Sequence, residues 1–551
     1  MRDFPQLAIV ADVELHNREE LLSSLAPELQ GTPLAGDSHL LLAAYAKWGV
    51  DCASFLLGEF AFAIWDARLR RLYCCCDQIG FRSFFYWQGK ASFVFAGDID
   101  CLLQFPSVPR ELNRRKFAGL DVPSGQHLYR QETFHAGIAA LPAGAWMTIE
   151  GDRIQRHTYW EPRGGKWVPR KPADAYEALR ETLFQAVECR VSEAYPAVAL
   201  LSGGLDSSAV VSIAARCLER RNRSLTAVSA VLPEGSGPIA DERPYISEFK
   251  SWPNVRIEYV TAPGRGPFDS LDNPGRFTAS PLLPSNFYLA DECVTTAFHC
   301  GARALLGGEG GEYGPTCWGD RYLVDLAMRL RWTTLMREMR SVGALHKVFP
   351  LRVLAGQFRN ILFPRRRLAP SVLLAPDFKR QWPAKVAFRS RWPYQKPHEV
   401  ALLRHRLGKQ AVPARALAGG LMWRSYPLLD KRVLELCLSL PPDLNVQGGY
   451  QRCLIRKSLD GILPKRIQWR TGKCPFSPDY FVRYNAQLGM AKEFVASIRA
   501  KDPVRSVVDV EHLGKLLEPV DPKAGKPGAV AEIPSTIYAI NFLRQFAEFQ
   551  P

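Results

Sequence analysis

The sequence predicts an α/β protein in which an N-terminal α+β sheet domain precedes a doubly wound parallel-sheet domain with a largely helical C-terminal part. Three patterns predict this order. Short apolar runs separated by glycine-containing turns dominate residues 1–160. Turn-forming and charged residues follow at 161–172, and beyond them strand-length apolar runs alternate with helical spacing. We therefore expect domains at 1–160 and 173–551, with a linker between them.

In the first domain the expected strands are short apolar runs bounded by turns. They lie at 6–10, 60–65, 71–75, 84–86, 92–95 and 145–149, with one helix expected at 38–48. Three consecutive cysteines occupy 74–76. No second pair and no spaced histidines complete a tetrahedral metal site around them, so we interpret them as small buried residues of a strand.

In the second domain a helix is expected at 173–190, and buried strands follow at 198–201, 225–231, 256–261 and 302–306. Helical stretches separate these strands, among them 207–220, as is typical of a parallel sheet covered by helices on both faces. Residues 321–550 show mostly helical spacing, with an exposed polar break at 521–528.

Composition narrows the class of protein. The chain has 551 residues, of which 47% are hydrophobic and 23% charged, as in a globular protein and unlike a disordered or collagen-like one. No apolar run is long enough to span a membrane, and no signal peptide is evident. Thirteen cysteines, an odd number, do not form a disulfide framework in a chain of this length. We expect a cytoplasmic protein with no membrane partner.

The net charge of +16 is concentrated in one segment. Residues 321–410 hold 20 basic and 4 acidic residues, so the rest of the chain is balanced. Such a segment attracts anions, or it is simply a solvated basic helical face. It contains no nucleic-acid-binding motif, so we expect no nucleic-acid partner.

The most informative motif is S-G-G-L-D-S-S at 202–208, between an expected buried strand and an expected helix. Two glycines allow the backbone to approach a polyphosphate, and hydroxyls and N–H groups at a helix start point toward it. Asp206 is suited to hold Mg²⁺ on phosphate oxygens. An ordinary turn explains the glycines but not the whole string, and the lysine of a Walker-type loop is missing, which disfavours a kinase or GTPase. The candidate nucleotide-binding residues here are Leu201, Ser202, Gly203, Gly204, Asp206, Ser207 and Ser208.

This string resembles the pyrophosphate loop of the N-type ATP pyrophosphatases, and four further motifs resemble those of the asparagine synthetase superfamily. Residues 305–312 (L-L-G-G-E-G-G-E) are similar to the family's L-S-G-E-G-S-D, and 423–430 to R-x-P-F-L-D. Residues 452–456 with Leu463 and Pro464 are similar to K-x-L-L-R…L-P. Residues 470–477 resemble R-x-K-E-x-F-S with one inserted residue. Each motif alone is weak, but their order and spacing are specific.

The resemblance implies ATP and Mg²⁺ as cofactors, with AMP and pyrophosphate as products. The family's two metal-binding acids fall on Asp206 and Glu312, and its catalytic lysine falls on Lys473. Glu309 matches the residue that orients or deprotonates the attacking amine. Gly307 and Gly308 belong to the same loop, in which Gly307 and Glu312 replace the family's Ser and Asp, and backbone groups of Leu201 and Ala230 would contact adenine.

Residues 37–48, 58–66 and 77–86 resemble the class II (Ntn-type) glutamine amidotransferase half of asparagine synthetase. Arg2 stands where the family's nucleophilic Cys follows the initiator Met, and Asp12-Val13 replace the Asn-Gly of the glutamine site. Without the thiol and the oxyanion-hole residues, glutaminase chemistry should be absent. We expect this degenerate domain to survive as a scaffold.

An amide-forming enzyme without its own ammonia source must use another amine. Within the superfamily, the chain resembles the lasso peptide cyclases (macrolactam synthetases) most, since β-lactam synthetase has a Tyr where Glu309 stands. That resemblance implies a precursor (core) peptide as substrate, an isopeptide ring as product, and leader-peptidase and leader-recognition proteins as partners. Two alternatives stay open: a small-molecule ligase (β-lactam closure or ammonia-dependent asparagine synthesis), and a non-catalytic nucleotide-binding protein.

Overall fold

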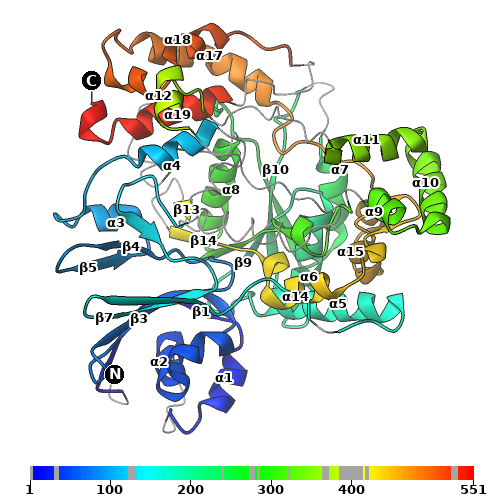
Figure 1. Ribbon diagram of the computed structural model, residues 1–551. Coiled ribbons are helices and arrows are strands. Elements are labelled where there is room, and N and C mark those ends of the chain that lie inside the picture. Colours follow the sequence, from blue (N-terminus) through cyan, green and yellow to red (C-terminus); the bar gives the residue numbers. More distant parts are fainter. Residues whose placement is uncertain are drawn as a thin grey trace.

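In the computed structural model, two sheet-centred parts lie side by side, and the C-terminal helices pack beside both (Figure 1). The structure describes residues 4–29, 36–121, 131–165, 167–236, 241–269, 271, 280–281, 286–319, 322–362, 372–383, 414–415, 421–522 and 532–550. Much of the basic segment 321–410 and of the predicted polar break at 521–528 lies outside these ranges.

The described residues of the N-terminal part form two antiparallel sheets and short helices. The larger sheet has the order β1 (Leu7–Leu15), β2 (Gly58–Asp66), β3 (Arg71–Cys76), β7 (Ala145–Glu150) and β8 (Arg153–Thr158). The smaller has the order β5 (Phe93–Ala96), β4 (Phe85–Gln88) and β6 (Ile138–Ala140). Helices α1 (Arg18–Ser24) and α2 (Asp37–Trp48) cover the larger sheet, and α3 (Ile99–Leu103) packs on the smaller one (Figure 1). The predicted α+β sheet domain is thus confirmed as a layered sandwich.

The three consecutive cysteines lie in β3 and point alternately to the two faces of the larger sheet, as the period of a strand requires. Cys75 belongs to the core beneath α2, whereas Cys74 and Cys76 belong to the core between the two sheets. None of the thirteen cysteines, all of which lie in described ranges, forms a disulfide. The interpretation of Cys74, Cys75 and Cys76 as small buried residues of a strand is confirmed.

A parallel sheet forms the centre of the second part. Its order is β11 (Val255–Val260), β10 (Leu225–Ala230), β9 (Ala197–Leu200), β12 (Ala304–Leu306), β14 (Leu421–Ser425) and β13 (Ala414–Arg415), and only the β13–β14 pair is antiparallel. Helices α5 (Pro172–Glu188) and α6 (Leu205–Glu219) pack on one face, and α8 (Phe287–His299) packs on the other. The predicted doubly wound sheet is confirmed.

The remaining helices complete this part. Near the sheet lie α7 (Arg243–Ile246), α14 (Lys431–Ser439), α15 (Cys453–Ser458) and α16 (Lys465–Gln468). At its side lie α9 (Tyr322–Met328), α10 (Trp332–His346) and α11 (Pro350–Leu362). The C-terminal group consists of α12 (Pro376–Gln381), α17 (Tyr480–Ala496), α18 (Val510–Leu516) and α19 (Glu532–Leu543). A short hairpin joins β15 (Val446–Gln447) to β16 (Tyr450–Gln451). The described residues between 322 and 550 are therefore mostly helical, as predicted. The sequence did not predict six of the strands in the described ranges, namely β6, β8, β13, β14, β15 and β16.

The C-terminal helices share their core with a segment of the N-terminal part. Phe117 of α4 (Arg114–Ala118) and Phe134 pack against Phe542 of α19, with ring centroids 6.3 and 5.8 Å apart. Arg114 of α4 also pairs with Glu548, near the end of the chain. Figure 1 shows α4 lying against α12 and α19. The two parts are therefore joined by a common hydrophobic core as well as by the chain between them.

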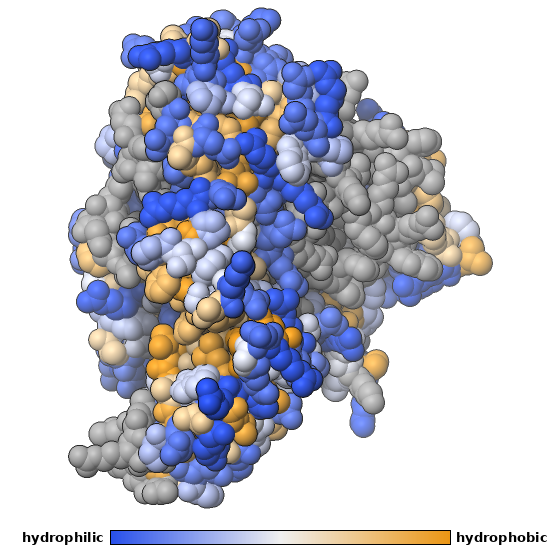
Figure 2. Space-filling model, turned by 60° about the vertical axis from the view of Figure 1, so that its left-hand side comes forward, coloured by the Kyte–Doolittle hydropathy of each residue, from blue (hydrophilic) through white to orange (hydrophobic). Residues whose placement is uncertain are grey.

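The surface shows two further features. In the view of Figure 2, hydrophobic residues gather over the lower part, where the N-terminal strands lie, and the upper part is mainly hydrophilic. Among the described residues, no helix combines the length and the hydropathy needed to cross a bilayer.

Candidate functional site

The predicted site residues converge at the point where the order of the parallel sheet reverses. Strand β9 has β10 on one side and β12 on the other, so the loops that follow β9 and β12 leave the sheet side by side. The two loops touch at Gly308, where a Cβ atom would lie only 2.4 Å from the backbone nitrogen of Ser207. Gly308 therefore has no room for a side chain, and the lack of a side chain at this position allows the two loops to touch.

The loop after β9 is held by its own hydroxyl groups. The Oγ of Ser207 accepts a hydrogen bond from the Ser202 backbone nitrogen at 3.0 Å and lies 2.9 Å from the Ser202 Oγ. Gly203 adopts a left-handed φ of 66°, which favours glycine. Helix α6 begins at Leu205, two residues before the predicted start, so Asp206 lies in its first turn. The backbone N–H groups of this turn and the helix dipole favour a bound phosphate.

Asp206 fits a divalent cation. Its Oδ1 is buried and has no hydrogen-bond partner among the described residues. A Cβ atom on Gly311 would lie 2.6 Å from that oxygen, so glycine keeps the space in front of it open. Its Oδ2 lies 3.4 Å from the Nη1 of Arg452, whose guanidinium stacks 3.5 Å from the ring centroid of Trp318. An unpartnered carboxylate oxygen facing an open space is the donor that Mg²⁺ prefers.

Glu312 shares the electrostatic environment of Asp206. Displacement of water by neighbouring atoms, followed by the negative charges of Asp206 and Glu309, raises the pKa of the Glu312 carboxyl, although Arg452 opposes this. The side chain still reaches solvent at its exposed end. A cation between two neighbouring carboxylates offsets their negative charges, so Glu312 and Asp206 together fit the predicted metal site.

Lys473 lies against the phosphate-binding loop. A Cβ atom on Gly204 would lie 3.3 Å from the Lys473 Nζ, and both Lys473 and Ser202 line the pocket at the end of the sheet. The lysine side chain is exposed, as expected of a group that meets a ligand. Its position beside the N-terminus of α6 would place its charge next to bound phosphates.

Glu242, which the sequence did not single out, and Arg470, the first residue of the motif at 470–477, hold this lysine in place. Glu242 accepts hydrogen bonds from Nη1 and Nη2 of Arg470 at 2.5 and 3.0 Å, and from the backbone nitrogen of Cys474 at 2.6 Å. The same Nη1 donates to the carbonyl oxygen of Gly203 at 2.7 Å. The pair therefore ties the segment that carries Lys473 to the glycine loop.

Glu309 lies on the other loop, beside buried aromatic and basic groups. Burial raises the pKa of Tyr426, and the charge of Glu309 raises it further. Tyr426 packs over Gly307, where a Cβ atom would lie 3.1 Å from its ring. Arg424 is buried nearby, and its pKa is raised by interactions with Tyr426 and Glu309 although burial alone would lower it. Tyr426 and Arg424 thus orient the carboxylate of Glu309, which is exposed to solvent.

Three other predicted residues differ in accessibility. Ala230, at the end of β10, lines the pocket together with Leu289 and Phe476. Leu201 is buried, and its N–H donates to Val228 within the sheet, so only its carbonyl side is available to a ligand. Ser208 is fully buried in α6, and its Oγ has no partner among the described residues, so its hydroxyl does not face the pocket.

The predicted remnant of a glutamine site lies between the two parts. Arg82 is surrounded by the carboxylates of Asp12, Glu14 and Glu59, at 3.5 to 3.7 Å. Burial raises the pKa of both Asp12 and Glu14, and the negative charge of Glu59 raises it further. The positive charge of Arg82 opposes this shift. Position 12 is therefore part of an ion-pair cluster, and the expected loss of glutamine chemistry stays a prediction. Arg2 lies outside the described residues.

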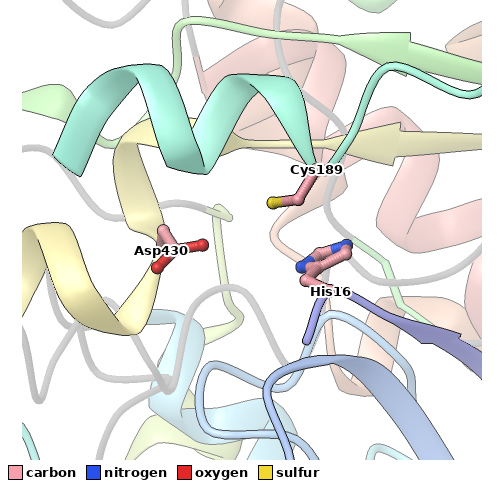
Figure 3. A group of neighbouring side chains, drawn as sticks. All are labelled: His16, Cys189 and Asp430. Carbon is pink, nitrogen blue, oxygen red and sulfur yellow. The ribbon is translucent and has the colours of Figure 1, made fainter. Parts of the chain in front are cut away.

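His16, Cys189 and Asp430 converge beside this cluster, as Figure 3 shows, in an arrangement that resembles a metal site. However, both oxygens of Asp430 are bound by arginines, with Arg190 at 2.7 Å and Arg432 at 2.9 Å. Although burial alone would raise it, these two guanidinium groups hold the pKa of Asp430 well below its usual range. Burial also raises the pKa of the Cys189 thiol. The group therefore lacks the free anionic ligands that a metal needs.

Comparison with known proteins gives the following matches. A family model described as asparagine synthase matches residues 178–527, and one described as glutamine amidotransferase domain matches residues 1–160. Asparagine synthetase [glutamine-hydrolyzing] 3 of Bacillus subtilis (strain 168) is 29% identical over 538 residues, covering 93% of this chain and 81% of that protein. Amidase chry2 of Gibberella zeae is 24% identical over 55% of this chain and 46% of its own length. A solved glutamine phosphoribosylpyrophosphate amidotransferase from B. subtilis aligns at a TM-score of 0.20 and 12% identity, over 46% of this chain and 61% of that one, a likeness too slight to bear on function.

Proposed function

The chain belongs to the asparagine synthase family, and on that premise we propose that it is an ATP-dependent amide-forming ligase of the lasso peptide cyclase type. In this proposal the enzyme adenylates an Asp or Glu side-chain carboxylate of a leader-processed peptide. The peptide's N-terminal amine then closes an isopeptide ring. ATP is the co-substrate, and Mg²⁺, held by Asp206 and Glu312, would neutralise charge on its phosphates.

One observation carries the adenylation step. Lys473 and Ser202 line a pocket at the switch point of the sheet. Asp206, with its unpartnered carboxylate oxygen, lies in the first turn of the helix that follows the Ser202 loop. Lys473 supplies positive charge where pyrophosphate leaves, and the helix start supplies N–H donors. A metal-dependent nucleotide site needs a positive charge, a carboxylate that binds the metal and N–H donors close together. A pocket that binds no nucleotide would not require a carboxylate beside a phosphate-binding loop.

The residues account for both bonds that change. A carboxylate oxygen of the substrate attacks the α-phosphorus of ATP, and the bond to pyrophosphate breaks. The amine then attacks the acyl carbon, AMP leaves with the bonding electrons, and the amine gives up a proton. Glu309 is exposed at the loop and is held from behind by Tyr426, so its carboxylate can accept that proton. Lys473 can also stabilise negative charge on the carbonyl oxygen during amine attack.

A peptide substrate is favoured by two features. The loss of the Asn-Gly of the glutamine site, where Asp12 and Val13 stand and Asp12 pairs with Arg82, supports an amine source other than glutamine. In addition, α10 and α11 project from the second part (Figure 1). These helices and the turn between them carry exposed apolar and basic side chains. The exposed apolar residues include Trp332, Met336, Phe349 and Leu351, and the exposed basic ones include Arg337, Arg340, Lys347 and Arg352. A surface of this kind suits a peptide, or a protein that delivers it, better than a small amino acid.

A second candidate is amide formation with free ammonia, on aspartate or another small carboxylate. It is favoured by the similarity to an asparagine synthetase over 93% of the chain. Both candidates share the adenylation chemistry, so they differ only in the acid and the amine that the enzyme accepts.

The proposal is tested by ATP–pyrophosphate exchange and product analysis. We expect exchange that depends on Mg²⁺ and on an acidic peptide with a free N-terminal amine, with a product lighter by one water. Asp206→Asn and Lys473→Ala should lower the rate at least about 100-fold, as is usual when a group that stabilises transition-state charge is removed. Lys515→Ala, which removes an exposed lysine of α18 outside the pocket, is the matched control.

The outcomes separate the candidates. Conversion of aspartate and ammonia to asparagine, with no reaction of acidic peptides, would favour the small-molecule enzyme. ADP and phosphate as the only nucleotide products would contradict adenylation. Binding of ATP without turnover on any of these substrates would favour a nucleotide-binding protein.

A further inference from the structure

A carboxylate of the N-terminal part is buried against the catalytic sheet. Glu59 lies near the start of β2 and is only 1% exposed. Its Oε1 accepts a hydrogen bond from the Oγ of Ser425 at 2.7 Å, and Ser425 is the last residue of β14. Arg190 and Arg82 lie 3.8 and 3.5 Å from the same carboxylate and compensate its charge. This bond therefore crosses directly from one part of the protein to the other.

Two further contacts reach the same short segment. The guanidinium of Arg82 stacks 3.5 Å from the ring centroid of Trp423. The ring of Phe81 stacks on Tyr426 at 6.0 Å. The N-terminal part therefore contacts side chains at positions 423, 425 and 426, which form the end of β14 and the residue after it.

That segment supports the loop that carries Glu309. The carbonyl oxygen of Ser425 accepts a hydrogen bond from the Gly307 nitrogen at 2.8 Å. Tyr426 packs over Gly307 and interacts with Glu309. The side chain of Ser425 bonds to Glu59, and its backbone bonds to Gly307. A displacement of Ser425 would therefore change both of these hydrogen bonds at once.

We propose that Glu59 is a positioning residue for the adenylating site, acting through Ser425 on the loop from Gly307 to Glu312. This inference deepens the proposed function and rests on it, because it assigns Glu59 a part in that reaction. The amidotransferase-like part is thereby more than a scaffold: it sets the position of the carboxylates of the other part. Displacement of a reacting group by about 1 Å can lower a rate about 100-fold, so a single buried bond at this point is sufficient.

The test compares matched carboxylate variants on one strand. Glu59→Gln keeps the shape of the side chain but removes the negative charge that interacts with Ser425, Arg82 and Arg190. Asp66→Asn makes the same change at the far end of β2, where Asp66 is fully buried and bonds to Arg68. Both are expected to lower the melting temperature. Only Glu59→Gln is expected to lower the kcat for ATP–pyrophosphate exchange, by about 10- to 100-fold, with the KM for ATP changed less than about threefold.

A double-mutant cycle with Ser425 identifies the route. Ser425→Ala should lower kcat about as much as Glu59→Gln, and the double variant should be no slower than the slower single one. Ser425→Thr, which keeps a hydroxyl, should restore most of the rate. If Glu59→Gln does not fold, Ser425→Ala and Ser425→Thr decide the matter by themselves.

The results are distinguishable. The acid used is aspartate or an acidic peptide, whichever supports exchange by the unaltered protein. Exchange that Ser425→Ala and Glu59→Gln leave unchanged, with only a loss of thermal stability as in Asp66→Asn, would overturn the positioning role alone. No exchange by the unaltered protein with either acid would overturn the proposed function and this inference with it.

Discussion

Arg470 binds the carboxylate of Glu242 through two nitrogens, although the two residues lie 228 positions apart in the chain. The pair is almost completely buried, and it also contacts the carbonyl of Gly203 and the backbone nitrogen of Cys474. One ion pair thus fixes the distance between the glycine loop and the lysine opposite it.

We predict that Glu242→Gln destabilises the protein by about 3 kcal/mol, because it leaves the charge of Arg470 buried without its partner. Although burial alone would raise it, the bonds from Arg470 and the Cys474 N–H lower the pKa of Glu242 below its ordinary value of 4.5. A carboxyl with a lowered pKa contributes its stability above the ordinary value and loses it as the pH falls through the folded-state value. Unfolding free energies of the two proteins should therefore differ most near pH 7 and converge as the pH falls below 4.5. A constant difference down to acid pH would contradict the ion-pair explanation.

We predict that Gly308→Ala abolishes adenylation and lowers the melting temperature, because a Cβ atom would collide with the backbone of Asp206 and Ser207. Gly489→Ala is the control: this glycine lies exposed in α17 with nothing near its Cβ position, so the change should stabilise by about 0.5–1 kcal/mol. Thermal unfolding and pyrophosphate exchange report both effects. Normal exchange by Gly308→Ala would show that the loops need not touch.

We predict no release of glutamate from glutamine, with or without ATP, because Asp12 and Val13 replace the Asn-Gly of the family's glutamine site and Asp12 pairs with Arg82. Amide formation should then depend on an amine supplied by the substrate or by ammonia. An enzymatic glutamate assay on purified protein decides the question. Glutamate production above a no-enzyme blank would contradict the prediction.

We predict that removal of residues 1–160 yields insoluble protein, because α4 forms part of the core of the C-terminal helices. The milder change Phe117→Ala should cost about 3–5 kcal/mol, as for other buried phenylalanines. Solubility and denaturant unfolding measure these effects. A soluble and active truncated protein would show that the shared core is dispensable.

We predict that charge reversal at Arg365, Arg366 and Arg367 raises the KM for the peptide and leaves ATP affinity nearly unchanged. These residues lie outside the described ranges, so this prediction rests on the sequence, in which the entire net charge falls between 321 and 410. Raising ionic strength from about 0.1 to 1 M shortens the Debye length from roughly 10 to 3 Å and should weaken the same step. An equal loss of ATP affinity would place the segment over the phosphates instead.

The elements that could be predicted from sequence are those with a clear apolar pattern. Strands β2, β3, β9 and β10 are continuous buried runs, and their predicted bounds agree with the structure within two residues. Strand β8 was missed because five of its six residues are exposed, so it has no apolar run. Strand β14 was missed because it contains Arg424, whose buried charge is met by tertiary partners.

The site was predictable where function depends on local sequence, as in the loop from Ser202 to Ser208. Glu242 was missed because its role depends on Arg470 and Cys474, which are distant in the chain. The contribution of Glu59 was missed for the same reason, since its hydrogen bond joins residues 366 positions apart. Contacts of this kind leave no pattern in a single sequence.

The ion pair between Arg114 and Glu548 spans 434 positions and has a consequence for biosynthesis. Phe117 emerges early from the ribosome, but the helix against which it packs is among the last segments to be made. The N-terminal sheets can form during translation, whereas the apolar face of α4 stays uncovered until α19 has been made. A nascent chain that has not yet reached α19 therefore exposes a hydrophobic surface.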